Sequence, residues 1–168
     1  MARTLLVIDI QNDYFPGGAL PLWEAEETEA RILSAIGQAR AAGDRVVLVQ
    51  HVSKAATGLF AAGAPGTELR PAVRAAAGDA PIVTKRVADA FQDTDLLAHL
   101  AGTDALLVCG MMTQNCVVFT ALSRAADGVA LTVIGDLCTA PTQTVHRIAL
   151  NALGSKLPVV SAADVWGA

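Results

Sequence analysis

Short apolar runs alternate with amphipathic segments along the whole chain. Most of these runs are continuous rather than alternating with polar residues, which is typical of strands that are covered on both faces of a sheet. The expected strands are Thr4–Asp9, Arg45–Gln50, Pro81–Lys85, Ala105–Gly110, Val129–Ile134 and Leu157–Val160. Together with the segments between them, they predict a three-layer α/β/α fold: a mainly parallel six-stranded sheet with helices on both faces.

Helix-type patterns fill the segments between most of these strands. Glu24–Ala42 carries acidic residues in its first turn and an apolar stripe, and Gly43 follows as a stop signal. Pro141–Leu153 has proline near its start and Gly154 after its end. The other expected helices are Asp93–Leu100, Asn115–Ala126 and a short one near Thr67–Ala77. The remainder of 51–80 is expected to be a long loop, and such loops are often functional.

Composition narrows the classes of function. The 168 residues fit one domain spanning 1–168, and 53% hydrophobic against 17% charged residues predicts a large core. A net charge of −4 without any cluster of Lys and Arg argues against a nucleic-acid partner. Because no apolar run approaches about 18 residues and no signal-peptide pattern is present, we expect no membrane span and a cytoplasmic location.

Polar residues follow four of the expected strands, in the segments 9–14, 50–53, 85–86 and 110–116. In open parallel sheets, active sites lie beyond the carboxyl ends of the strands. These segments are distant in sequence, yet the fold would bring them to the same end of the sheet. We therefore expect the active site there. The sequence has no phosphate-binding glycine motif and no close set of metal ligands, so neither a cofactor nor a metal is expected.

Cys116 is the first candidate for chemistry. The chain has three cysteines without a CxxC pair, so a disulfide framework is not expected. Thr113 is a plausible N-cap, which would place Cys116 in the first turn of a helix, where the dipole and free N–H groups favour a thiolate and could bind an oxyanion. A small buried thiol is the alternative for Cys116, and it is the expected role of Cys109 and Cys138.

Asp9 and Lys85 are the candidates to act with this cysteine. A carboxylate at the end of an apolar strand is costly unless it has partners, and Asp9 could be the general base that takes the thiol proton. Lys85 could pair with Asp9 and favour the thiolate. The alternatives are a turn residue for Asp9, a role that Asn12 and Asp13 fit better, and a solvated strand end for Lys85.

Three ordered segments resemble the isochorismatase-like cysteine hydrolases, which include nicotinamidases, N-carbamoylsarcosine amidases, ureidoacrylate amidases and streptothricin hydrolases. LLVIDIQNDYFPGGAL resembles the family's opening strand with its catalytic aspartate. Thr84-Lys85 resembles the lysine segment, and GMMTQNCVVFTAL resembles the cysteine segment most closely. The resemblance covers nearly the whole chain and implies an isochorismatase-like, Rossmann-type fold and a homo-oligomer.

The resemblance also implies roles for individual residues. Cys116 would be the nucleophile, Asp9 the base and Lys85 the electrostatic partner. A non-proline cis peptide bond would lie at Met111–Met112, and the N–H groups of Met112 and Cys116 would form the oxyanion hole.

The substrate contacts and the metal are less fixed by the resemblance. Tyr14 corresponds to an aromatic residue that lines the pocket in nicotinamidases, and we expect further contacts from His51 and Phe91. Nicotinamidases bind a metal through an Asp-x-His and a further His after the second strand. This chain has Gln50-His51-Val52-Ser53-Lys54 there, with no second His in the loop. The departure argues against a metal site and against nicotinamide as the substrate.

The sequence thus predicts a metal-free cysteine hydrolase that cleaves an amide or carbamoyl-type C–N bond in a small molecule through a thioester. Three alternatives remain open: a nicotinamidase without the usual metal, an isochorismatase-type ether hydrolase, and a non-catalytic binding or scaffold protein. Cys116 favours amide hydrolysis, because hydrolysis of the vinyl ether of isochorismate needs no cysteine nucleophile.

Overall fold

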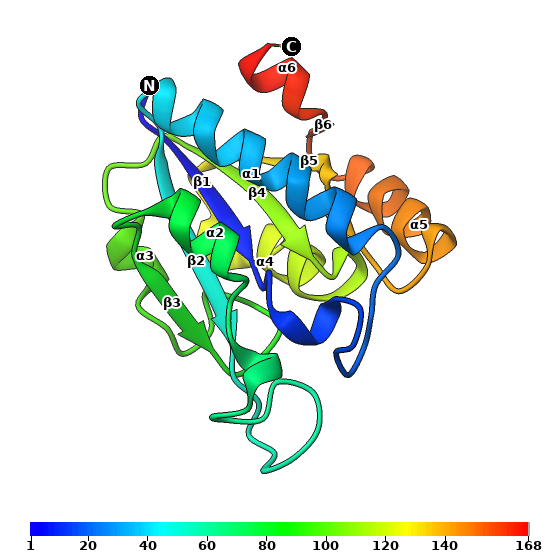
Figure 1. Cartoon of the computed structure of the whole chain (residues 1–168). Helices are drawn as coiled ribbons and strands as arrows, with labels where there is room; N and C mark the ends of the chain where they lie inside the picture. The colour runs from blue at the N-terminus through cyan, green and yellow to red at the C-terminus, as the bar shows by residue number, and fades with distance from the viewer. Residues whose placement is uncertain (168) are drawn as a thin grey trace.

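The computed structural model describes residues 1–167 and contains a six-stranded sheet in which every neighbouring pair is parallel (Figure 1). The strand order is β3-β2-β1-β4-β5-β6. The strands are β1 (Arg3–Ile8), β2 (Arg45–His51), β3 (Ile82–Lys85), β4 (Ala105–Met111), β5 (Ala130–Thr139) and β6 (Val159–Val160). The predicted α/β class and the predicted number of strands are confirmed.

Helices cover both faces of the sheet (Figure 1). The chain first runs from β1 outward to β3 and then returns past β1 to β4 and on to β6, so right-handed crossovers place the two sets of helices on opposite faces. The first set is α1 (Ala25–Ala41) and α2 (Pro71–Ala77), and the second is α3 (Leu96–His99), α4 (Val118–Ala121) and α5 (Gln143–Gly154). The last helix, α6 (Ala162–Trp166), packs against α1 and β5.

The two central strands, β1 and β4, form the core of the sheet. Nearly all of their side chains are buried, because each strand has neighbours on both sides and helices on both faces. At the carboxyl end, Gly110 has a φ of +124°, and a Cβ built there would lie 2.1 Å from the carbonyl oxygen of Ile8. Only glycine allows the two backbones to approach this closely, directly beside the residues discussed below.

The predicted helix Asn115–Ala126 is wrong as a single element. The structure has a π-turn at Thr113–Val117, the short α4, and a 3₁₀ turn at Arg124–Ala126. Consecutive β-branched residues in this segment lower its helix propensity, and the hydroxyl of Ser123 accepts a hydrogen bond from the N–H of Ala125 and so begins a new turn. The apolar pattern correctly predicted that this segment is buried, but it did not predict that the helix is interrupted.

Two other differences lie nearer the end of the chain. Strand β5 continues to Thr139, beyond the predicted end at Ile134, while its register shifts against β4 between Val108 and Gly110. Helix α6 was not predicted from the sequence; Ser161 and Asp164 begin it with a capping box. Within residues 1–167, none of the helices is both long and apolar enough to span a membrane.

Candidate active site

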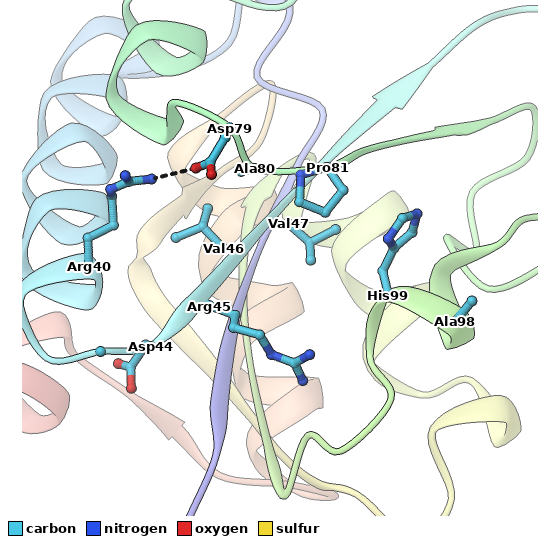
Figure 2. A pocket seen from close by; sticks show the side chains of 11 residues that line it. Arg40, Asp44, Arg45, Val46, Val47, Asp79, Ala80, Pro81, Ala98 and His99 are labelled. Carbon is cyan, nitrogen blue, oxygen red and sulfur yellow. Dashed lines mark ion pairs between the residues drawn. The ribbon is translucent and has the colours of Figure 1, made fainter.

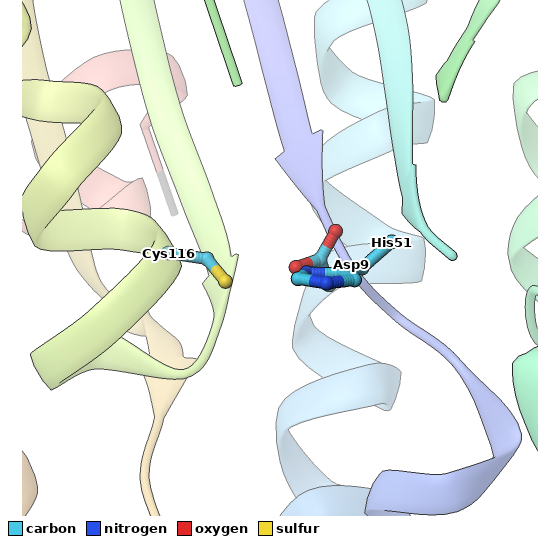
Figure 3. A group of neighbouring side chains, drawn as sticks. All are labelled: Asp9, His51 and Cys116. Carbon is cyan, nitrogen blue, oxygen red and sulfur yellow. The ribbon is translucent and has the colours of Figure 1, made fainter. Parts of the chain in front are cut away.

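The residues predicted to form a site lie together at the carboxyl end of the sheet. Asp9 follows β1, His51 and Lys85 end β2 and β3, and Cys116 lies in the π-turn after β4. Figure 3 shows the Cys116 sulfur directed across the gap between β4 and β1 toward Asp9 and His51. The chain order reverses between β1 and β4, and in open parallel sheets ligands bind at the carboxyl ends of the strands at such a point.

Lys85 connects the other two members of the predicted triad. Its Nζ lies 2.8 Å from Oδ2 of Asp9 and donates a hydrogen bond to Sγ of Cys116 at 3.2 Å. The side chains of Asp9 and Lys85 are fully buried, and Cys116 is 1% exposed. A buried charge is tolerated only with compensation, so these two charges depend on each other.

Asp9 leaves the strand in a left-handed backbone conformation, with a φ of +55°. Aspartate tolerates this conformation better than most residues. The N–H of Asp9 still donates to the carbonyl of Val49 at 3.0 Å, so the residue is held against β2 while the chain turns away. Apart from the ion pair with Lys85, its carboxylate oxygens accept no hydrogen bond from residues 1–167, which leaves acceptor capacity for another proton.

The structure confirms one prediction about the segment that carries Cys116, the cis peptide bond, and corrects another, the N-cap. The peptide bond between Met111 and Met112 is cis, as expected. Thr113 is not the N-cap: Met112 occupies that position without a side-chain bond, and the Thr113 hydroxyl is 2.8 Å from Nδ1 of His146. The buried His146 therefore ties the π-turn to α5.

The environment of Cys116 favours the thiol rather than the thiolate. Burial raises the pKa of this thiol, Asp9 raises it further, and Lys85 lowers it without reversing the direction. Burial is the largest of these effects, so the thiolate expected at a helix N-terminus is not the favoured form in this state; α4 follows the π-turn and is only four residues long. A proton acceptor is required before the sulfur can act as a nucleophile.

His51 completes the surroundings of Lys85. Its Nδ1 lies 2.9 Å from Nζ of Lys85. Burial of His51, followed by the charge of Lys85, lowers the pKa of the imidazole, which therefore favours the neutral form. For Lys85, burial by itself lowers the pKa, but the charge of Asp9, followed by the contact with the Cys116 sulfur, raises it on balance, so the ammonium form is favoured.

A metal ion does not fit this group of side chains. Asp9, His51 and Cys116 offer ligand atoms within 4.8 Å of one another. The Lys85 ammonium already lies 2.8 Å from Asp9, 2.9 Å from His51 and 3.2 Å from Cys116, so a cation lies among these three donors. A divalent ion in the same place would face the positive charge of Lys85 at close range.

Aromatic side chains lie next to the triad. Tyr14 meets the ring of Phe60 edge-on at 4.8 Å, and Phe60 lies 5.6 Å from the ring of His51. Burial, followed by Asp9 and Cys116, raises the pKa of Tyr14, which places its hydroxyl within their electrostatic reach. Phe91 is buried in the segment after β3. Phe60 was not predicted as a site residue; its signal in the sequence is a large aromatic residue within a loop rich in Gly and Ala.

Two polar residues near Asp9 hold the surrounding loops. The fully buried Gln11 bonds both backbone groups of His51, at 2.9 and 2.8 Å, and was missed as a site residue. Asp13, expected to be a turn residue that binds backbone N–H groups, accepts from the N–H groups of Ala19 and Phe60 at 3.2 and 2.8 Å. Through these contacts, the loop after β2 is fastened over the site.

The arrangement matches known proteins over most of the chain. Residues 3–164 match the family described as the isochorismatase domain. An uncharacterized isochorismatase family protein of Bacillus subtilis, YddQ, is 34% identical over 84% of this chain and 80% of its own length. Streptothricin hydrolase of Streptomyces noursei is 34% identical over 75% of this chain, which spans 50% of that protein. Nicotinamidase of Escherichia coli is 28% identical over 92% of this chain and 93% of its own.

Solved structures agree with this assignment. An isochorismatase family protein from Desulfovibrio vulgaris superposes with a TM-score of 0.89 at 27% identity, covering 98% of this chain and 96% of the other. The agreement extends over all six strands and the loops that carry the candidate site, because nearly the whole of both chains is included.

Proposed function

Because the chain belongs to the isochorismatase family of hydrolases, we propose that it is a cysteine-dependent amidohydrolase that cleaves a C–N bond in a small molecule. The observation that carries this proposal is the position of Lys85, whose ammonium contacts both the Asp9 carboxylate and the Cys116 sulfur. One buried cation thus links a proton acceptor to a thiol, which is what a nucleophile with a raised pKa needs.

The first half of the reaction forms a thioester. Asp9 takes the proton of Cys116, and the sulfur attacks the carbonyl carbon, so that a C–S bond forms and the carbonyl electrons move to oxygen. The N–H groups of Met112 and Cys116 are proposed to bind this oxyanion. When the C–N bond breaks, protonated Asp9 returns its proton to the leaving nitrogen.

The second half releases the acid. Water attacks the thioester carbon while Asp9 accepts a proton from it, the C–S bond breaks, and the proton on Asp9 returns to the sulfur. Lys85 stays protonated throughout. It stabilises negative charge on sulfur in one step and on the carboxylate in the next.

The substrate is proposed to be a small amide or carbamoyl compound with a flat, weakly charged body. Tyr14 and His51 bracket Phe60 beside the triad, and we propose Tyr14, His51 and Phe91 as substrate contacts. Streptothricin hydrolase and nicotinamidase, two of the relatives, supply the first compounds to try.

The test is the release of ammonia and acid by the purified, EDTA-treated protein across a panel of amides. The panel contains nicotinamide, streptothricin, N-carbamoyl amino acids and ureido compounds, and isochorismate tests the ether-hydrolase alternative. We expect turnover of at least one C–N substrate and a thioester adduct on Cys116 by intact-mass spectrometry, removable by hydroxylamine.

Cys138→Ala is the matched control for Cys116→Ala, because both thiols are buried but Cys138 bonds only the backbone, at Ile134. Cys116→Ala must lose turnover and adduct, whereas Cys138→Ala must keep both. Turnover that survives in Cys116→Ala would exclude the cysteine mechanism. Silence on the whole panel, with Cys116 no faster than Cys109 and Cys138 toward iodoacetamide, would favour a binding or scaffold role.

A further inference from the structure

We infer that His51 is a positioning residue for Lys85, and that its neutral imidazole fixes the ammonium between Asp9 and Cys116. The inference rests on the proposed function and deepens it, since it assigns to His51 a task other than contact with substrate. The ammonium has three hydrogens and lies near four acceptors: Asp9, Cys116, the His51 ring and the carbonyl of Val87 at 3.1 Å.

The direction of the His51 contact follows from the chemistry of its partner. A lysine ammonium can only donate, so Nδ1 of His51 must present its lone pair and the hydrogen of the neutral ring must be on Nε2. A protonated ring would direct a positive N–H at the ammonium. Lys85, Asp9, Cys116 and the ring of Phe60 surround the imidazole.

The backbone of His51 is itself fixed. Gln11 accepts from its N–H at 2.9 Å and donates to its carbonyl at 2.8 Å, and it donates a second bond to the carbonyl of Thr67 at 2.7 Å. His51 is also paired in register with Lys85 across β2 and β3. The imidazole is thus anchored to the strand next to the lysine, and its Nδ1 is a fixed point for a flexible side chain.

This fixed point matters because Lys85 has to serve two partners in turn. While Asp9 is charged and Cys116 is a thiol, the ammonium is drawn toward the carboxylate, and after proton transfer it is drawn toward the sulfur. A neutral acceptor on the third side keeps Nζ within reach of both. Without the imidazole, the Val87 carbonyl is the neutral acceptor that remains, so Lys85 is held less firmly between its two partners and the thiolate is stabilised less.

The experiment compares His51→Asn with His51→Leu. The two replacements are nearly the same size, but asparagine has a carbonyl oxygen near the position of Nδ1 and leucine has no acceptor. We expect His51→Leu to lower kcat about tenfold, the equivalent of about one pKa unit at the sulfur, in addition to any change in KM from the lost substrate contact. Alkylation of Cys116 by iodoacetamide, measured without substrate, should slow to a similar extent, and His51→Asn should restore most of both rates.

A double-mutant cycle with Lys85→Met separates positioning from other roles. If His51 acts through the lysine, His51→Leu adds no further loss in the Lys85→Met background. Equal rates for the asparagine and leucine variants, a change confined to KM, or full additivity in the cycle would each overturn the inference. The alkylation arm does not need a substrate, so it can succeed even if the amide panel is silent and the proposed function fails.

Discussion

The two ends of the sheet differ in how their polar side chains are exposed to solvent, and the end with the open cleft is not the end with the candidate active site. At the amino ends of β2 and β3 lies an open cleft of about 600 Å³, lined by residues with basic or acidic side chains that include Arg40, Arg45, Asp79 and His99 (Figure 2). At the carboxyl ends, Asp9, Lys85 and Cys116 are buried within the range of direct contact. The open cleft is therefore not where the titratable groups are in direct contact.

The difference is one of solvent. In the cleft, Arg40 and Asp79 are 3.7 Å apart and the Asp79 side chain is 99% exposed, so water and salt screen the pair and its groups act independently. Around Lys85 there is no such screening. Burial, followed by the neighbouring charges, raises the pKa of Cys116 and lowers the pKa of His51.

The largest effect is expected from the nucleophile. Cys116→Ala should lower kcat/KM about a thousandfold or more, because no other group can form the thioester, while the circular dichroism spectrum stays unchanged. Asp9→Asn should approach the same loss, since it removes the proton acceptor. An Asp9→Asn enzyme that keeps most of its rate would show that the acceptor is another group.

Stability should respond most to breaking the buried ion pair. Lys85→Met leaves the Asp9 carboxylate buried without a cation, which should cost about 3–5 kcal/mol in urea unfolding. The double variant with Asp9→Asn removes both charges and should regain much of this stability while remaining inactive. If the double variant is no more stable than Lys85→Met, the charges are not coupled as the distances indicate.

An intermediate effect is expected from loosening the loop after β2, which Asp13 holds. Asp13→Ala removes the acceptor for the N–H groups of Phe60 and Ala19, and a buried charged hydrogen bond of this kind contributes about 1.5–3 kcal/mol. We expect faster hydrogen exchange at Phe60, faster proteolysis in the exposed segment 54–58, and a changed KM. Exchange and proteolysis equal to those of the wild type would mean that other contacts hold the loop.

A smaller effect is expected from pH. Burial, followed by the neighbouring positive groups Lys85 and Arg31, lowers the pKa of His51 and His146 in the folded protein. The unfolded chain therefore takes up protons at these residues first as the pH falls below about 6.5, so stability is full above that pH and declines below it. The urea midpoint should fall from pH 7 to pH 5, and less steeply in His51→Asn.

The smallest effect is expected in the cleft. Asp79→Asn and His99→Asn alter exposed or partly exposed ion pairs, so kcat/KM should stay within about twofold of the wild type. A large loss of activity in either variant would remove the distinction between the two ends of the sheet.

Much of the fold and part of the site could be predicted from sequence. Continuous apolar runs identified all six strands, and ordered motifs singled out Asp9, Lys85 and Cys116, because both signals are local. Phe60 and Gln11 were missed since each owes its place to partners about 40 residues or more away along the chain. The prediction of a continuous helix after β4 was wrong because an apolar pattern indicates burial. It does not indicate where the backbone hydrogen bonds change from one type of helical turn to another.

By itself, the sequence determined which segments form strands, because the hydrophobic pattern is a property of neighbouring residues. It also determined that the polar residues after these strands lie at one end of the sheet, because parallel strands all end there. Only the tertiary structure decided that Cys116 is held as a thiol and that the cation among Asp9, His51 and Cys116 is the Lys85 ammonium. Protonation and ion preference depend on burial and on distances between groups from four separate strands, and these are set when the chain folds.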